Sequence, residues 1–322
     1  MTAIVRDSAS IITICVHCYN NMSVDVAHEY FTWKLVQEVA EQNGYFEQED
    51  VDPDLDYFAP GTQDFSERGE NAHDADWWND LDEQGQTHGV CEWNAVQESS
   101  ETDRQIVGSY SEWDRVLFSA ADSELETLEG LKNRSIGINK YATSFYSIRQ
   151  MLQNEGFEDD EIVFQHIGSA EERFDAVKSG EVDCIGVLEP YVTLGRYDDE
   201  LQEVYDGPCR AALVAPPETD PEQVNAFRTA LNRAVDDINS DLDQYQDRYV
   251  DLLEEAAEEE PETFADVNFE RLRDEFELRS FLPVREPDEE RVDSTTEWMA
   301  ESGFVDDTSD ITLPEAEEAE AP

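Results

Sequence analysis

Basic residues are scarce in this chain of 322 residues. It holds 21 lysines and arginines against 79 aspartates and glutamates, which gives a formal net charge of −58 at pH 7. The lysines are limited to Lys34, Lys132, Lys140 and Lys178. A protein that binds nucleic acid neutralises phosphates with a basic patch, and the sequence shows none. Nucleic acid is therefore excluded as a partner.

The acid excess runs along the whole chain and does not form one block. Hydrophobic residues make up 39% of the sequence and aromatic residues 10%, which is too much for a disordered chain. In dilute buffer such a charge repels itself and loosens the fold, whereas molar salt shortens the Debye length to about 3 Å. The composition thus favours a folded, halophilic protein from an acidic proteome over one with a local acidic surface for a partner.

Long apolar runs are also missing. The run at residues 11–16 has only six residues and predicts a core strand, because a secretory signal needs a longer apolar stretch and a cleavage site. A membrane-spanning helix needs about 20 apolar residues. We expect no transmembrane segment. The sequence as written predicts a cytoplasmic protein, and a missing leader or a misassigned start would place it outside.

Signatures of common enzymes are absent from the sequence. It contains neither GxGxxG nor GxxxxGK(S/T), and neither HExxH nor GxSxG. Its five cysteines are an odd number for a disulfide framework, and the pair Cys15 and Cys18 has no second pair at zinc-finger spacing. We expect no cofactor and no metal, and buried thiols for most of the cysteines.

Strand-like and helix-like patterns alternate along the chain. This alternation predicts an α/β fold with parallel-rich sheets flanked by helices. The polar stretch 60–86 predicts a long loop, and the acidic tail 305–322 predicts disorder. The predicted strands are 11–17, 55–58, 115–119, 136–138, 163–167, 184–188 and 211–215, with a buried element at 89–93. The predicted helices are 24–42, 144–155, 170–178 and 190–196, and long amphipathic helices fill 221–259. Gly44 is expected to cap the first helix.

Three segments resemble a known family. They are Asn43-Gly44-Tyr45-Phe46, LEGLKNRSIGIN at 128–139 and AVKSGEVDCIGVLEPYV at 176–192. Together they are similar to the substrate-binding proteins of ABC importers for nitrate, aliphatic sulfonates, taurine and thiamine-pyrimidine precursors, over most of residues 10–285. The resemblance implies a two-lobed type II periplasmic-binding-protein fold with an interlobe cleft.

The expected lobes are discontinuous. Residues 1–118 with 211–304 would form lobe one, and 119–210 lobe two. Two α/β lobes joined by crossing strands make a cleft at the carboxyl ends of their strands, and closing the lobes buries a ligand there.

The resemblance also implies a set of ligand-binding residues. Thr143 and Ser144 can cap a helix, and the free N–H groups of that helix start can hold an anion. Glu189 can cap a helix or bind an amine or a ring N–H, and Trp93 can pack in the core or against the ligand. The full set is Cys18, Tyr19, Asn20, Cys91, Glu92, Trp93, Thr143, Ser144 and Glu189.

These observations predict a protein that binds a small anionic organic molecule, with an ABC permease as a possible partner. The alternative is a cytoplasmic enzyme of the same fold. The thiamine-pyrimidine-synthase branch carries a cysteine-rich motif where this chain has only Cys209. The desulfinase branch uses a cysteine directly after the first strand, where this chain has Cys18. Its base would be His28 or His88, although His73 and His88 fall in the predicted loop region and are expected to face solvent.

Overall fold

The structure is a computed structural model that describes residues 26–28, 31–53, 55–57, 87–140, 143–259, 261, 264–305, 311 and 313. The predicted strand 11–17, the loop 60–86 and most of the tail 305–322 lie outside the described residues. Within these ranges no helix is long and apolar enough to cross a membrane.

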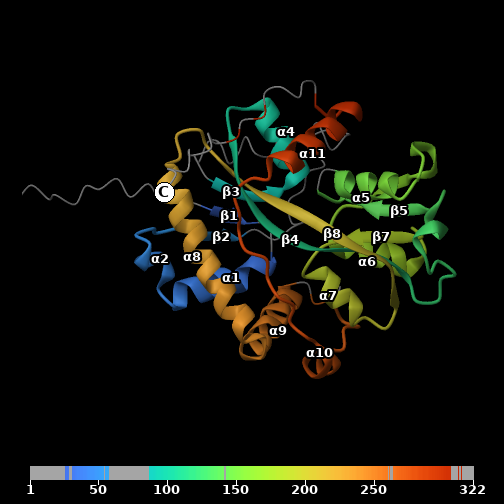
Figure 1. The fold of residues 1–322 in the computed structure, drawn as a ribbon. Coiled ribbons are helices and arrows are strands. Elements are labelled where there is room, and N and C mark those ends of the chain that lie inside the picture. The colour runs from blue at the N-terminus through green and yellow to red at the C-terminus, as the bar shows by residue number, and fades with distance from the viewer. Residues whose placement is uncertain are drawn as a thin grey trace, which may run out of the picture.

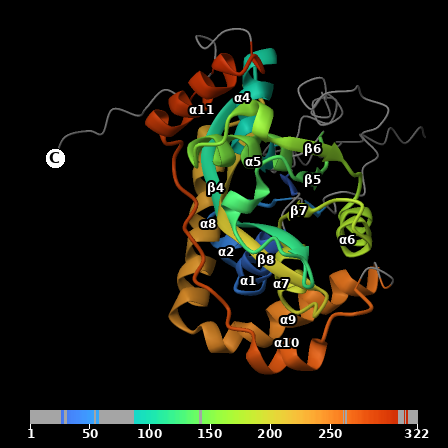
Figure 2. The same ribbon diagram turned by 90° about the vertical axis from the view of Figure 1, so that its right-hand side faces the viewer.

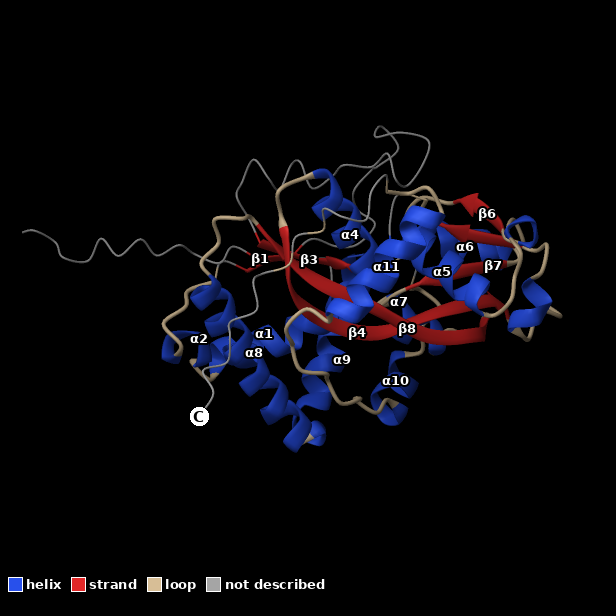
Figure 3. Cartoon of the chain, turned by 45° about the horizontal axis from the view of Figure 1, so that its top comes forward, coloured by secondary structure: helices blue, strands red, loops and turns tan. Residues whose placement is uncertain are grey.

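The described strands form one sheet with the order β2-β1-β3-β8-β4-β7-β5-β6 (Figure 3). At one end β1 pairs in parallel with β2 and β3, and at the other β5 pairs in parallel with β6 and β7. The two long central strands, β4 and β8, are antiparallel to each other and to their outer neighbours. The bounds are β1 Val26–His28, β2 Leu55–Tyr57, β3 Thr87–Cys91, β4 Gln105–Ala120, β5 Ser135–Ile138, β6 Val163–His166, β7 Cys184–Val187 and β8 Leu201–Ala215.

Helices cover both sides of the central strand pair. Figures 1 and 2 show α4, α5 and α11 on one side, and α1, α7, α8, α9 and α10 on the other. The helices are α1 Phe31–Gln42, α2 Tyr45–Gln48, α4 Glu92–Glu101, α5 Thr143–Asn154, α6 Ala170–Ser179, α7 Tyr191–Arg196, α8 Pro221–Ser240, α9 Leu242–Glu259, α10 Phe269–Glu275 and α11 Glu289–Glu301, with single 3₁₀ turns at Leu128–Leu131 and Asp159–Glu161.

Helix α8 shows how the sequence builds these layers. Asp220 caps its start by accepting a hydrogen bond from the Glu222 N–H, and Pro221 occupies the first turn, where its missing N–H does no harm. Its buried side chains recur every three or four residues, which places them on one face. Phe227 on that face stacks on Phe46 of α2, with ring centroids 5.7 Å apart.

The predicted α/β fold is confirmed, with some boundaries corrected. The predicted helix 24–42 is wrong at its start, because Val26–His28 is strand β1 and the helix begins at Phe31. The predicted strands 115–119 and 211–215 are only parts of β4 and β8. Residues 201–210 of β8 mix buried with partly or fully exposed positions, so a search for fully buried runs finds only the end of the strand. Gly44 has φ 66°, the left-handed conformation expected of a residue that ends a helix.

Candidate functional site

The two halves of the sheet meet at the middle of the β4–β8 pair. Strand β3 ends at Cys91, opposite Ala211 of β8, whereas β7 ends at Val187, opposite Val116 of β4. The stretch between these strand ends includes Asp114 and Arg115. Successive side chains of a strand point to opposite faces, so these two residues face opposite sides of the pair. We call these sides the Asp114 side and the Arg115 side.

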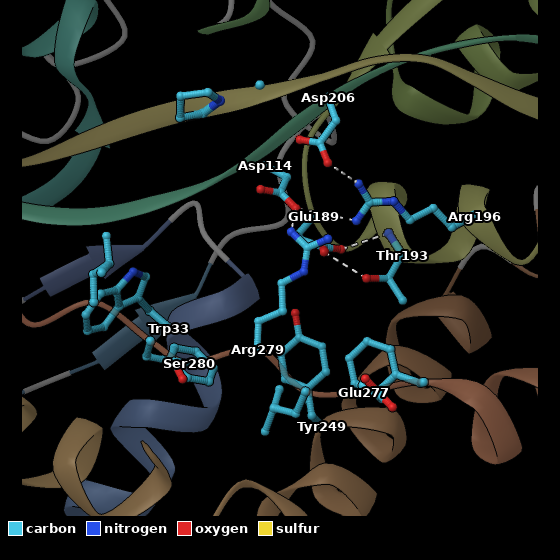
Figure 4. A pocket seen from close by; sticks show the side chains of 16 residues that line it. Trp33, Asp114, Glu189, Thr193, Arg196, Asp206, Tyr249, Glu277, Arg279 and Ser280 are labelled. Carbon is cyan, nitrogen blue, oxygen red and sulfur yellow. Dashed lines mark hydrogen bonds and ion pairs between the residues drawn. The ribbon is translucent and has the colours of Figure 1, made fainter. Parts of the chain in front are cut away.

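The Asp114 side holds a cavity of about 400 Å³ (Figure 4). Trp33 of α1 and Tyr249 of α9 line it together with residues 276–282, which follow α10. Glu189, Thr193 and Arg196 line it from the segment after β7, and Asp206 lines it from β8. Its volume is within the range of small-molecule pockets.

The arginines of this cavity are already paired. Arg196 bonds Glu203 at 2.8 Å, Asp206 at 2.7 Å and Asp114 at 3.4 Å. Arg279 pairs with the same Asp114. Because carboxylates occupy both guanidinium groups, the cavity offers an incoming anion little attraction.

Glu189 lies two residues after the end of β7 and caps the start of α7 with its side chain. Its carboxylate accepts hydrogen bonds from the Thr193 N–H at 3.0 Å and from the Thr193 hydroxyl at 2.7 Å. No salt bridge joins it to a basic residue in the described part of the chain. Burial raises the pKa of its carboxyl to about 7. The predicted capping role is confirmed, and the ligand-binding role of Glu189 stays a prediction.

Arg115 occupies the opposite side of the strand pair and is only 2% exposed. Its Nε and Nη1 atoms are buried and make no hydrogen bond, and no carboxylate of the described residues forms an ion pair with it. Burial lowers the pKa of its guanidinium, which nevertheless stays charged because the ordinary pKa of arginine is so high.

The ionisable groups that act most strongly on the pKa of Arg115 are Cys209, Tyr205 and Cys91. Burial raises the pKa of the Cys209 thiol to about 11, and it also raises the pKa of the Tyr205 phenol. The Cys91 thiol donates a hydrogen bond to Asn94 Oδ1 at 2.8 Å, so it carries its proton. These neighbours bring no negative charge to Arg115.

The predicted site residues Glu92 and Trp93 contact other parts of the protein. Glu92 is buried, where Oε2 pairs with Arg291 Nε at 2.6 Å and Oε1 accepts from the Thr295 hydroxyl at 2.5 Å, both of α11. The Trp93 Nε1–H donates to Gln150 Oε1 of α5 at 2.9 Å. Helix α11 therefore closes over the start of α4, which the sequence patterns did not predict.

Cys91, another predicted site residue, caps α4. Its Sγ accepts a hydrogen bond from the Asn94 N–H at 3.4 Å. Helix α5 begins at Thr143, which confirms the predicted helix start. The side chains of Thr143 and Ser144 lie outside the described residues, as do Cys18, Tyr19, Asn20 and the side chain of His28.

The expectation that His88 faces solvent is wrong. His88 belongs to β3 and is fully buried, with its Nε2 2.7 Å from Glu98 Oε2. Glu98 also forms an ion pair with Arg104 Nε at 2.8 Å. All five residues of β3 are buried, so both faces of the strand are covered, and a carboxylate satisfies His88 in the interior.

The sequence analysis missed Asp114, Arg115 and Arg196. One signal was available: Asp114-Arg115 is a charged pair directly before the apolar residues of the predicted strand 115–119. Charges within a core strand are costly unless they are paired or functional. Among the described residues, no three His, Cys, Asp or Glu side chains are arranged to hold a metal ion.

The strand order, the helices on both sides and the long central pair define a two-lobed periplasmic-binding-protein fold. Solved structures share it. The alkanesulfonate-binding protein SsuA from Xanthomonas axonopodis pv. citri, bound to MOPS, is 12% identical with a TM-score of 0.62, over 90% of this chain and 96% of that one. The periplasmic aliphatic sulphonate binding protein SsuA from Escherichia coli is 13% identical with a TM-score of 0.64, over 90% and 95%.

A third structure, PhnD1 from Prochlorococcus marinus in complex with methylphosphonate, is 13% identical with a TM-score of 0.52, over 89% of this chain and 100% of that one. At such identities the likeness establishes the fold. No protein-family model matches the chain, and no curated protein matches it.

Proposed function

We propose that this chain is a substrate-binding protein that holds a small anionic organic molecule between its lobes and delivers it to an ABC permease. Its fold supports the proposal, as do solved proteins of that fold whose names include alkanesulfonate and methylphosphonate ligands. The lobes of this proposal are residues 1–118 with 211–304, and 119–210.

One observation carries the proposal: side chains from both halves of the sheet meet across the middle of β4 and β8. Helix α4, which follows β3, contacts α5, which follows β5, through Trp93–Gln150 and Tyr146–Gln97 hydrogen bonds of 2.9 and 3.0 Å. A molecule bound at this junction contacts both lobes at once, so it stabilises the closed arrangement over an open one.

Native mass spectrometry of protein purified without added ligand tests the proposal. We expect a bound small molecule that is released unchanged on unfolding. Adding that molecule back to stripped protein should raise the melting temperature and reduce the radius of gyration in small-angle X-ray scattering. A stripped protein that no small anionic or neutral molecule stabilises would contradict the proposed function.

The enzymatic alternative stays a prediction, because Cys18 lies outside the described residues. The two functions also require different locations. A receptor for an importer meets its ligand outside the cytoplasm, whereas the enzyme would work inside, so fractionation of the source cells separates them. A salt-rich environment is part of the same proposal and rests on the acid excess alone.

A further inference from the structure

Arg115 differs from the other buried arginines of the described chain. Arg104 is 1% exposed and forms an ion pair with Glu98, whereas Arg173 is 8% exposed and donates to the carbonyl oxygens of Gly186 at 2.5 Å and Ser169 at 3.2 Å. Arg115 is 2% exposed and its buried Nε and Nη1 donate to nothing among the described residues. A chain with 79 acidic residues has no shortage of partners to place there.

An unpaired buried charge is a large unfavourable term, since desolvation is not offset by a counter-charge. Structural arginines therefore come with partners, as Arg104 and Arg173 do. A guanidinium without one in the interior, at the junction of two lobes, is what a site for an anionic group needs, because the ligand supplies the missing charge.

The position across from Arg115 is a glycine, and the Tyr205 ring covers it. This cross-strand partner on β8 is Gly207, which has no side chain. A Cβ at Gly207 would lie 2.6 Å from Tyr205 Cε1, so glycine lets the tyrosine ring approach the strand. The start of α4 adds the positive end of a ten-residue helix on the same side, near Cys91.

The charges at this junction set the charge of the ligand. Glu92 in the first turn of α4 is neutralised by Arg291, so it does not offset Arg115. The neighbouring thiols and phenol are neutral. One positive charge therefore remains, and it matches a single negative charge, whereas a dianion would leave a buried charge without compensation.

We infer that Arg115 is the charge-recognising residue of the junction, and that its ligand carries a singly charged oxyanion, a sulfonate or a carboxylate. This inference rests on the proposed function. A planar guanidinium binds either group through two parallel N–H···O bonds. Because Arg115 is buried beneath α4, α5 and α11, binding requires the lobes to open and close again around the ligand.

The test uses isothermal titration calorimetry of the full chain in molar potassium chloride. The probes have similar size: 1-propanesulfonate, butanoate, 1-propylphosphonate at an alkaline pH where it is a dianion, butanamide and propylammonium. Chloride competes equally with every anion, so the ranking of the probes is the readout. We expect sulfonate or carboxylate to bind more tightly than the dianion, the amide and the amine.

The variant Arg115→Met removes the charge and keeps the length of the side chain. We expect it to weaken binding of the monoanion by roughly tenfold or more. The matched control is Arg228→Met, which loses the same charge from a partly buried arginine of α8 that pairs with Glu286. The control should bind as the wild type does. Arg115→Lys keeps the positive charge but cannot make the two parallel N–H···O bonds of a guanidinium. It should therefore bind the monoanion more weakly than the wild type does and still prefer it over the other probes.

A second measurement separates ligand recognition from a structural role. Without ligand, Arg115→Met should be at least as stable as the wild type, because the unpaired charge is gone, whereas loss of a structural arginine would lower its melting temperature. A destabilised ligand-free variant, or unchanged anion binding in Arg115→Met, overturns the inference. If the protein carries a small anionic molecule whose binding Arg115→Met does not change, the inference fails and the proposed function stands.

Discussion

Asp114 and Arg115 are adjacent on β4 and have opposite electrostatic environments. Asp114 is held by Arg196 and Arg279, whereas Arg115 has no counter-charge among the described residues. Alternation of the strand separates them onto two sides, so the acid cannot neutralise the base next to it in sequence. The β4–β8 pair thus carries a paired ionic cluster on one side and, among the described residues, a cation without a counter-charge on the other.

Stability should depend strongly on salt. The net charge of −58 repels itself across the molecule, and screening removes this repulsion. We expect the melting temperature to rise by many degrees from dilute buffer to molar potassium chloride, measured by circular dichroism. A control with potassium glutamate separates screening from a chloride effect. If the melting temperature stays the same from dilute buffer to molar salt, the interpretation that the composition is adapted to salt is wrong.

The carboxyl of Glu189 should make stability depend on pH. Burial raises its pKa from 4.5 to about 7 in the folded protein. The folded protein therefore keeps a proton that the unfolded chain gives up, and the stability from this group is fully present below pH 4.5 and lost as the pH rises toward about 7. In urea titrations between pH 4.5 and about 7, the free energy of unfolding of the wild type should fall relative to that of Glu189→Gln as the pH rises. If the difference in free energy of unfolding between the two proteins does not vary with pH, the carboxyl of Glu189 does not titrate in this way.

The described cysteines should be inert. Cys91, Cys184 and Cys209 are buried, and burial raises the pKa of the Cys184 and Cys209 thiols. Since only a thiolate attacks well, iodoacetamide should modify these three slowly in the folded protein and quickly in urea. Peptide mapping of all five cysteines gives the rates. Selective fast modification of Cys18, lost in Cys18→Ser, would favour the enzymatic alternative.

The contact between Glu92 and Arg291 should fasten α11 to α4. Arg291→Met leaves the buried Glu92 without a counter-charge and should lower the free energy of unfolding by about 3 kcal/mol. Glu92→Gln combined with Arg291→Met should recover most of that loss, because no buried charge then remains. If the double variant is as unstable as Arg291→Met alone, the loss comes from packing of α11.

The sequence predicts the elements well where the hydrophobic pattern is local. The helix starting at 143 and the strands near 136 and 184 follow from short apolar runs and helical spacing. The lengths of β4 and β8 were not predictable in this way, because much of their hydrogen bonding is to each other across about 90 residues of chain.

The candidate site was predictable only in outline. Glu189, Cys91 and the start of α5 have the predicted backbone positions. The pairing of Glu92 with Arg291, however, joins residues far apart in sequence, so no local sequence pattern predicts it. Arg115 was missed for the same reason: the role proposed for it rests on the absence of a partner among the described residues, which only the three-dimensional arrangement reveals.

Arg196 bonds three carboxylates from two strands, and Lys178 likewise lies within 4 Å of Asp198, Glu200 and Asp266. Each of these two cations serves three anions, so losing one of them breaks three contacts at once, whereas losing one of its acids breaks a single contact with it. To make this protein stable in buffers of low salt, substitutions should therefore begin with Asp→Asn and Glu→Gln at acids that form no ion pair. Every existing arginine and lysine should be kept.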